Sequence, residues 1–164
     1  MLYFSYGSNM SHRRLRQRTP SAEFVAMALL SHHSLRFHKA GRDDSAKCDA
    51  FFTDQAEDVV FGVVFHIDPA EREHLDRAEG LGAGYESKTV SLITPKFEPI
   101  EAFTYYATSI DESLSPYHWY KEHVLVGSRE NNLPNRYTQA ITLIESIADP
   151  DKKRAAREAA LYEV

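Results

Sequence analysis

The chain has 164 residues, of which 43% are hydrophobic and 26% charged, and its formal net charge is −5. This composition is typical of a folded protein and excludes an intrinsically disordered chain, and the negative charge gives no general attraction to nucleic acid. We expect a single domain over residues 1–164, since a chain of this size buries about 70% of its unfolded surface.

The cysteine content and the distribution of apolar residues indicate the cellular compartment in which the protein is found. Cys48 is the one cysteine, which excludes a disulfide framework or a multi-thiolate zinc site within this chain. The first residues lack a basic leader, and no stretch approaches the roughly 18 apolar residues of a membrane span. We therefore expect a cytoplasmic protein that does not bind a membrane.

The first element is a strand followed by a tight turn and a helix. Aromatic residues dominate positions 2–6, which predicts a short buried strand, and Gly7 marks the turn. Ser11 can cap a helix over residues 11–18, before Pro20. Such a junction directs unpaired backbone amides at one point, so the turn is a candidate anion site.

The predicted first helix carries an unusual run of cations. Four arginines lie within residues 12–18, where they could meet phosphate or carboxylate groups. A charge run on a helix is more often a solvated face, and we expect that here.

Residues 22–38 favour one or two extended segments, and residues 47–53 and 59–67 favour further strands. Gly62 interrupts the last of these, which predicts a bulge or a close approach of backbone. The segment beginning at Asp68 and Pro69 is the best helix start in the chain, and Gly80 ends that helix after Glu79.

The second half of the chain turns from strands to helices. Residues 85–93 and 99–106 favour strands, whereas residues 117–126, 137–147 and 150–162 favour helices. Neither a repeat nor a linker divides the sequence. These elements predict one α+β domain with its strands early and its helices late.

Glu79 is the candidate for proton transfer. It lies at the C-terminal end of the predicted helix, where the negative end of the helix dipole opposes a carboxylate charge and favours the protonated form. A carboxylate in so unfavourable a position suggests a role in general acid–base chemistry, although an exposed or structural carboxylate is the commoner case.

Other chemistries find less support. Ser8 follows Gly7 but lacks the second glycine of a nucleophile elbow, and the same turn lacks the residues of a nucleotide-binding loop. Nothing activates the Cys48 thiol, which we expect to be structural. The histidine spacings do not place two rings on one face of a strand or helix, so we expect neither a metal nor another cofactor.

Three segments resemble the γ-glutamylcyclotransferase family in sequence and order. They are YFSYGSNM at residues 3–10, LDRAEG at residues 75–80 and LPNRY at residues 133–137. Residues 59–64 also resemble the strand that precedes the family's central helix. The resemblance implies a compact mixed β-barrel with flanking helices, and it spans nearly the whole chain.

The same resemblance implies a reaction and its residues. In it, the α-amine of a γ-glutamyl compound attacks its own γ-carbonyl, closes 5-oxoproline and expels an amine or amino acid, with Glu79 as general base and then general acid. The substrate class could be γ-glutamyl amino acids, glutathione, γ-glutamylamines or carrier-linked intermediates. The implied substrate-binding residues are Tyr3, Phe4, Ser5, Tyr6, Gly7, Ser8, Asn9, Tyr85 and Tyr137.

Two alternatives stay open from the sequence. The fold could serve as a non-catalytic module that senses an amino-acid-like or acidic ligand, or the arginine run could contact nucleic acid, which we rank last. We expect a small-molecule substrate as the partner, neither nucleic acid nor membrane, and leave a homodimer open.

Overall fold

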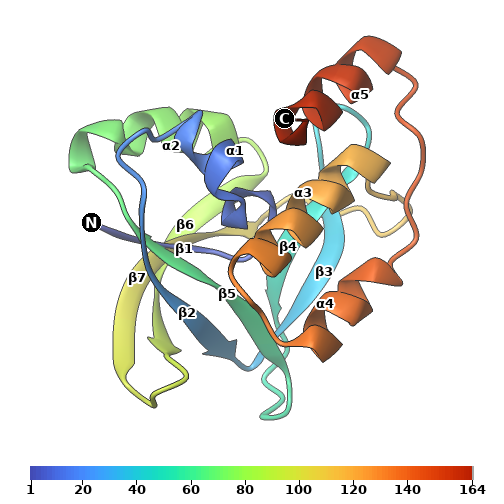
Figure 1. Cartoon of the computed structure of the whole chain (residues 1–164). Coiled ribbons are helices and arrows are strands. Elements are labelled where there is room, and N and C mark those ends of the chain that lie inside the picture. Colours follow the sequence, from blue (N-terminus) through green and yellow to red (C-terminus); the bar gives the residue numbers. More distant parts are fainter. Residues whose placement is uncertain (164) are drawn as a thin grey trace.

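In the computed structural model, which describes residues 1–163, five strands close into a barrel in the order β1-β5-β2-β6-β7 (Figure 1). The strands are β1 (Leu2–Ser5), β2 (Glu23–Ser31), β5 (Val59–His66), β6 (Tyr85–Ile93) and β7 (Pro99–Ala107). Antiparallel pairs make most of the barrel, and β1 closes it by pairing in parallel with β7 at Tyr3 and Phe103. The expected mixed barrel with flanking helices is confirmed.

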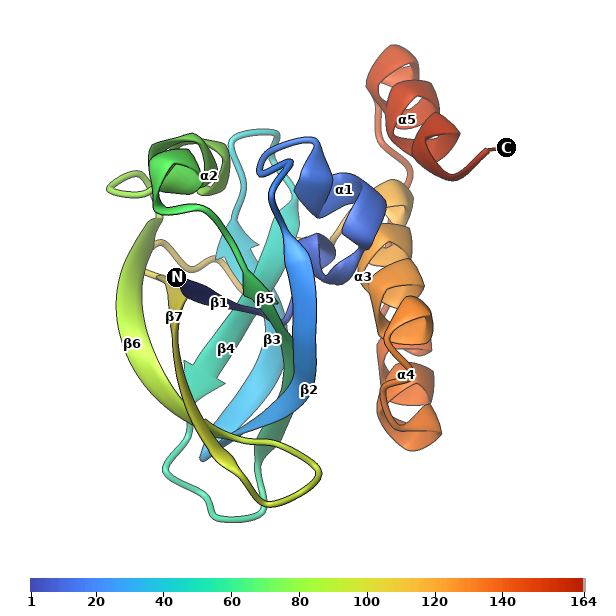
Figure 2. The ribbon, with the colours of Figure 1, turned by 60° about the vertical axis from the view of Figure 1, so that its left-hand side comes forward.

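Two further strands form a hairpin beside the barrel (Figure 2). Strand β3 (His33–Ala40) pairs in antiparallel fashion with β4 (Ala46–Phe52), with an irregularity in register between Phe37 and Lys39. The turn of this hairpin, residues 41–45, lies at the same end of the barrel as the first two helices (Figure 2).

Within residues 1–163, five α-helices flank the barrel, and three short 3-10 turns precede or extend them. The α-helices are α1 (His12–Arg16), α2 (Arg72–Glu79), α3 (His118–Glu130), α4 (Asn135–Thr142) and α5 (Lys152–Ala159), and the 3-10 turns are Ser8–Met10, Pro69–Glu71 and Ala160–Tyr162. Every expected helix is found. The fourth lies earlier than predicted, at Asn135–Thr142 instead of 137–147, because Pro134 caps its first turn with the extended backbone that proline favours.

The segment that ends at Glu79 is built as the sequence predicts. The Asp68 carboxylate accepts a hydrogen bond from the Ala70 amide at 2.8 Å, and Pro69 occupies the first helical position. Gly80 ends the helix with φ 77°, a left-handed conformation that glycine adopts without a Cβ clash. Glu79 is thereby fixed at the last turn of α2.

Two glycines allow parts of the backbone to come unusually close. A Cβ on Gly62 would lie 2.4 Å from the Ser5 carbonyl oxygen, so β1 and β5 depend on its absence. This confirms the close approach that the sequence predicted at Gly62. A Cβ on Gly127 would lie 2.5 Å from Met10 Cβ and 2.6 Å from the Ser11 amide, so α3 packs directly against the turn that follows β1.

The core fills the barrel and the space between it and α3. Its fully buried side chains include Phe4, Phe65, Leu75, Leu92 and Val124. Among the helices formed by residues 1–163, none combines the length and hydropathy needed to cross a bilayer.

Candidate active site

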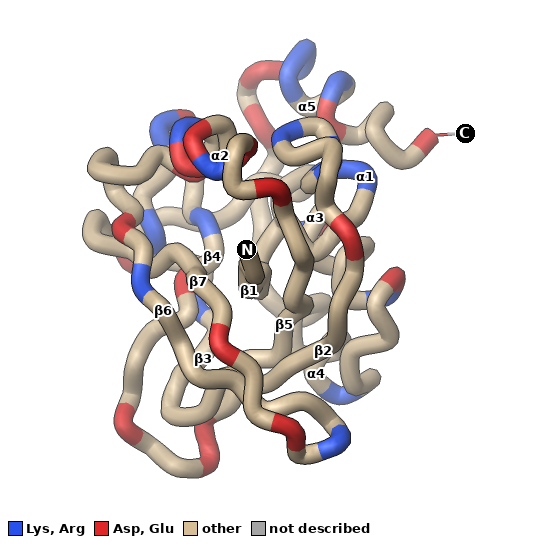
Figure 3. The backbone as a smooth tube through the Cα atoms, turned by 90° about the vertical axis from the view of Figure 1, so that its left-hand side faces the viewer, with Lys and Arg blue, Asp and Glu red and all other residues tan. Residues whose placement is uncertain are grey.

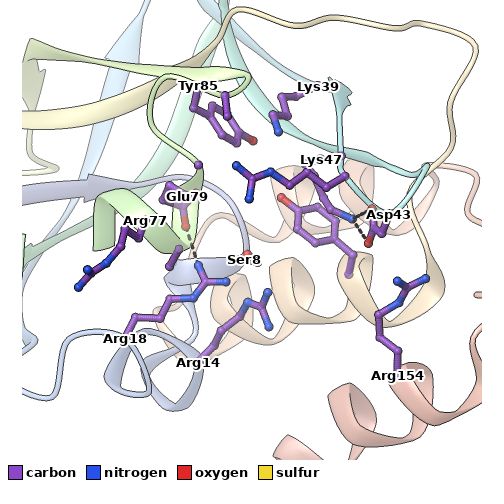
Figure 4. A pocket seen from close by; sticks show the side chains of 16 residues that line it. Ser8, Arg14, Arg18, Lys39, Asp43, Lys47, Arg77, Glu79, Tyr85 and Arg154 are labelled. Carbon is purple, nitrogen blue, oxygen red and sulfur yellow. Dashed lines mark hydrogen bonds and ion pairs between the residues drawn. The ribbon is translucent and has the colours of Figure 1, made fainter. Parts of the chain in front are cut away.

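A cavity of about 370 Å³ opens at the end of the barrel where the turn after β1, the end of α2, the β3–β4 turn, α3 and α5 meet (Figure 4). Its wall includes Ser8, Arg14, Arg18, Lys39, Gly41, Arg42, Asp43, Lys47, Arg77, Ala78, Glu79, Gly80, Ala83, Tyr85, Tyr120 and Arg154. Segments from both ends of the chain therefore contribute to a single wall.

Glu79 is held at this wall through one of its two carboxylate oxygens. Oε1 accepts hydrogen bonds from Asn9 Nδ2 at 2.8 Å and from Arg18 Nη1 at 2.6 Å. The same Arg18 nitrogen donates to Asn9 Oδ1 at 2.7 Å, which completes a three-membered network. Oε2 accepts no hydrogen bond from residues 1–163, so one oxygen is anchored and the other is free to exchange a proton.

The ion pair with Arg18 modifies the picture that the sequence suggested for Glu79. The sequence interpretation considered only the helix end and burial, whereas in the structure Arg18 Nη1 lies 2.6 Å from Glu79 Oε1 and compensates the carboxylate charge. The side chains of Arg18 and Glu79 are 21% and 17% exposed, so solvent screens this pair only partly.

A narrow extension of about 20 Å³ continues from the cavity into the protein, and Ser8, Glu79, Tyr85 and Tyr120 line both parts. The extension has room for about one water-sized group. Its remaining wall consists of Tyr3, Ser5, Tyr6, Gly7, Asn9, Cys48 and Tyr105. The Ser5 hydroxyl is buried there and has no hydrogen-bond partner within residues 1–163.

The phenols around the extension are neutral and mostly committed to the fold. Burial raises the pKa of Tyr3, Tyr6, Tyr85 and Tyr120 well above the ordinary value, so each keeps its proton. Tyr6 donates to the carbonyl oxygen of Tyr105 at 2.6 Å, and Tyr85 donates to the carbonyl oxygen of Cys48. These bonds fix the ring positions that shape the extension.

The wall of the cavity is rich in cationic side chains although the whole chain is acidic. Seven cationic side chains line it, Arg14, Arg18, Lys39, Arg42, Lys47, Arg77 and Arg154, against the two carboxylates of Asp43 and Glu79. Figure 3 shows basic positions on α1, α2 and α5 at this end of the barrel. The field in the cavity therefore favours an anionic ligand.

Most of the predicted site residues come together here. Tyr3, Ser5, Tyr6, Gly7, Ser8, Asn9, Glu79 and Tyr85 line the cavity or its extension. Phe4 does not, because strand alternation turns its ring into the barrel core, where it is fully buried.

Tyr137 also lies elsewhere, which corrects the expectation for the third segment. It is on α4, and its ring packs edge-on against Phe61 with ring centroids 5.0 Å apart. It lines a separate cavity, beside Leu35, Phe37 and other residues outside the Glu79 site. Tyr137 lines neither the cavity at Glu79 nor its extension.

The sequence interpretation missed several cations of the site. We expected the arginine run to be a solvated helix face, and this is wrong for Arg14 and Arg18, whose side chains are 11% and 21% exposed and face the cavity. The signal was their spacing of four residues, which places two side chains on one side of a predicted helix; in the structure α1 ends at Arg16, and Arg18 lies in the turn that continues it. Lys39 and Tyr120 carried no comparable signal.

The Cys48 thiol lies in the wall of the extension but is not activated. Burial raises its pKa to about 12. The structural role expected for this cysteine agrees with that environment. Among residues 1–163, no group of three or more His, Cys, Asp or Glu side chains is arranged to hold a metal ion.

Comparison with known proteins identifies the family. A profile of the AIG2-like family matches residues 59–141. A gamma-glutamylcyclotransferase of Bos taurus is 32% identical over 148 residues, which cover 88% of this chain and 78% of that protein, and one of Homo sapiens gives the same values. The chain belongs to the gamma-glutamylcyclotransferase family. The resemblance of the three segments is thereby confirmed.

A solved structure extends the family relationship to three dimensions. A gamma-glutamyl cyclotransferase matches this fold with a TM-score of 0.84 and 27% sequence identity, over 96% of this chain and 97% of that one. The bovine and human relatives and the matched solved structure are all gamma-glutamylcyclotransferases, which are enzymes. The chain is accordingly an enzyme, and the non-catalytic module considered from the sequence is the less supported interpretation.

Proposed function

We propose that the cavity at Glu79 cyclises a γ-glutamyl amino acid or a related γ-glutamyl compound to 5-oxoproline and releases an amine or amino acid. The observation that carries the proposal is the anchoring of Glu79, whose Oε1 is fixed by Asn9 and Arg18. Family membership supports the reaction type, and the cationic cavity suits a substrate that carries carboxylates.

In this mechanism, Glu79 Oε2 accepts a proton from the substrate's α-ammonium group. The resulting amine attacks the γ-carbonyl carbon, a new C–N bond closes the five-membered ring, and the carbonyl oxygen becomes an oxyanion. Glu79 then gives this proton to the departing nitrogen as the original C–N bond breaks and the carbonyl re-forms. The second proton of the ring nitrogen then passes through the ionised Glu79 to the released amine, which leaves as an ammonium ion. The same carboxylate begins and ends the cycle ionised, and the reaction requires no enzyme nucleophile.

Backbone amides of the Ser8–Met10 turn are proposed to orient the substrate and receive the developing oxyanion. In that turn the Met10 amide donates to the Gly7 carbonyl oxygen and the Ser11 amide donates to the Ser8 carbonyl oxygen. The backbone amides of Ser8 and Asn9 are therefore not used by the hydrogen bonds of the turn itself. Fixed amides of this kind stabilise an oxyanion without reorganisation. Because ring closure is intramolecular, holding the amine near the carbonyl supplies much of the rate.

The test is formation of 5-oxoproline from a panel of γ-glutamyl amino acids and γ-glutamylamines by purified protein. Glu79→Gln removes the proton carrier and should lower kcat by about 10²–10⁴-fold. Glu73→Gln is the matched control, because its carboxylate lies on the same helix with a side chain 82% exposed. Product formation by Glu79→Gln at the unaltered rate would remove Glu79 from the mechanism, and absence of product across the panel would reject the reaction.

A further inference from the structure

We propose that the preferred leaving group is an acidic amino acid, and that Lys39 together with Arg42 binds its side-chain carboxylate. This inference rests on the proposed cyclisation and specifies its substrate class. It starts from Lys39, a lysine of β3 that is only 5% exposed.

Lys39 is a buried cation that makes no ion pair with any carboxylate of residues 1–163, although the more distant charges of Glu79 and Asp43 act on it. Its ammonium lies 4.7 Å from the centroid of the Tyr85 ring, and burial lowers its pKa. A buried charge is unfavourable unless a counter-charge is close, so the site gains stability when an anion binds there.

The position of Lys39 is supported by its neighbours. A Cβ on Gly84 would lie 3.1 Å from Lys39 Nζ, so the glycine leaves the space that the ammonium occupies. Figure 4 shows Lys39 beside Tyr85 and directed into the cavity, on the side away from Arg14 and Arg18. An anion at Lys39 would therefore lie across the cavity from Arg14 and Arg18.

Most of the other cations are neutralised by the protein itself. The pairs are Arg14 with Glu158 at 2.8 Å, Arg18 with Glu79 at 2.6 Å, Lys47 with Asp43 at 2.8 Å and Arg154 with Asp149 at 2.6 Å. Arg77 contributes to the wall of the cavity, but its side chain is 62% exposed, pairs with Glu73 at 3.4 Å and directs its guanidinium outward (Figure 4). Among the cations that line the cavity, Lys39 and the exposed Arg42 make no ion pair with any carboxylate of residues 1–163.

This balance of charge in the cavity wall predicts which γ-glutamyl dipeptides bind best. One with a neutral leaving residue carries two carboxylates and one ammonium, a net charge of −1, whereas an acidic leaving residue brings the net charge to −2. Two uncompensated cations match the second. The cavity of about 370 Å³ is of a size for a small ligand such as a dipeptide.

The experiment compares isosteric substrates that differ only in charge. Values of kcat/KM are measured for γ-glutamyl-glutamate against γ-glutamyl-glutamine, and for γ-glutamyl-aspartate against γ-glutamyl-asparagine. We expect the acid of each pair to be preferred by about tenfold or more, the ratio that a charge-assisted hydrogen bond provides. The preference should fall as salt is raised, because ions screen the partly open cavity.

Variants assign the preference to Lys39. Lys39→Met should lower kcat/KM for γ-glutamyl-glutamate by more than it lowers kcat/KM for γ-glutamyl-glutamine, so that the acid-to-amide ratio falls toward one, and Lys39→Arg should restore the ratio. Lys96→Met, at an exposed lysine, is the charge-matched control. Thermal melting of each variant shows whether it folds, and the wild-type comparison stands even if a variant does not.

The possible results separate the two proposals. Turnover of all four substrates with acid and amide equal would overturn the acidic leaving group and leave the cyclisation intact. An equal loss of kcat/KM for the acid and amide substrates in folded Lys39→Met would also overturn it, because Lys39 would then not distinguish the two side chains of the leaving residue. Absence of 5-oxoproline from every substrate would instead reject the cyclisation.

Discussion

Gly127→Ala is expected to destabilise the protein, although alanine is the better helix former. Within α3, alanine in place of glycine should by itself add about 1 kcal/mol of stability. Here the new Cβ would lie 2.5 Å from Met10 Cβ and 2.6 Å from the Ser11 amide nitrogen, where ordinary contacts begin near 3.4 Å. One side must shift by roughly 1 Å, and overpacking of this kind costs about 1–3 kcal/mol.

The effect should appear in both stability and activity. The gain in helix propensity and the cost of overpacking leave a net loss of up to about 2 kcal/mol, so at about 2–4 °C per kcal/mol in a chain of this size we expect Tm to fall by up to about 8 °C. The displaced turn carries Ser8 and Asn9, so kcat/KM for 5-oxoproline formation should fall by as much as about 10²-fold. Arg129→Ala, an exposed position of the same helix, should change the free energy of unfolding by less than about 0.5 kcal/mol. A Gly127→Ala protein with a raised Tm and full activity would refute this account of the packing.

Two further predictions concern titratable groups. With a pKa of about 12, Cys48 should react with a disulfide reagent at pH 8 roughly a thousandfold more slowly in the native protein than after unfolding in urea; comparable rates would contradict its burial. The hydrogen bond with His123 and the charge of Arg14 lower the pKa of Glu158 to about 2, so its stabilisation is complete above the unfolded pKa of about 4.3 and is lost as pH falls through about 2. Glu158→Gln should therefore weaken the dependence of unfolding free energy on pH between about 5 and 2, measured by urea titration, whereas Glu122→Gln at an exposed position should not; an unchanged acid limb in Glu158→Gln would count against the pair.

The elements were predictable where local chemistry decides them. Alternating and aromatic runs gave the strands, and Asp68, Pro69 and Gly80 marked the two ends of the segment that carries Glu79. The turn after β1 was equally visible from Gly7. These signals depend on neighbours in sequence, which is why the position of Glu79 beside a glycine loop was found without a structure.

The rest of the site depends on contacts between distant segments. Arg18 meets Glu79 across 61 positions of sequence, and Lys39 enters the cavity because β3 and its turn come to the end of the barrel. Composition and residue spacing do not predict contacts between side chains that lie far apart in the sequence. Tyr137 is the opposite case, in which a sequence motif predicted a residue at the site that is not found there. In the structure its ring packs on Phe61 and lines a different cavity.

The wall of the Glu79 cavity runs from Ser8 to Arg154, almost from one end of the chain to the other. A ligand that contacts both the α1 side and α5 would act as a non-covalent cross-link between the first and last helices. Ligand binding would then raise the free energy of local unfolding of α5, because α5 must release the ligand before it can detach from the barrel. Hydrogen exchange in α5, far along the chain from the catalytic turn, should therefore slow when the active site is occupied.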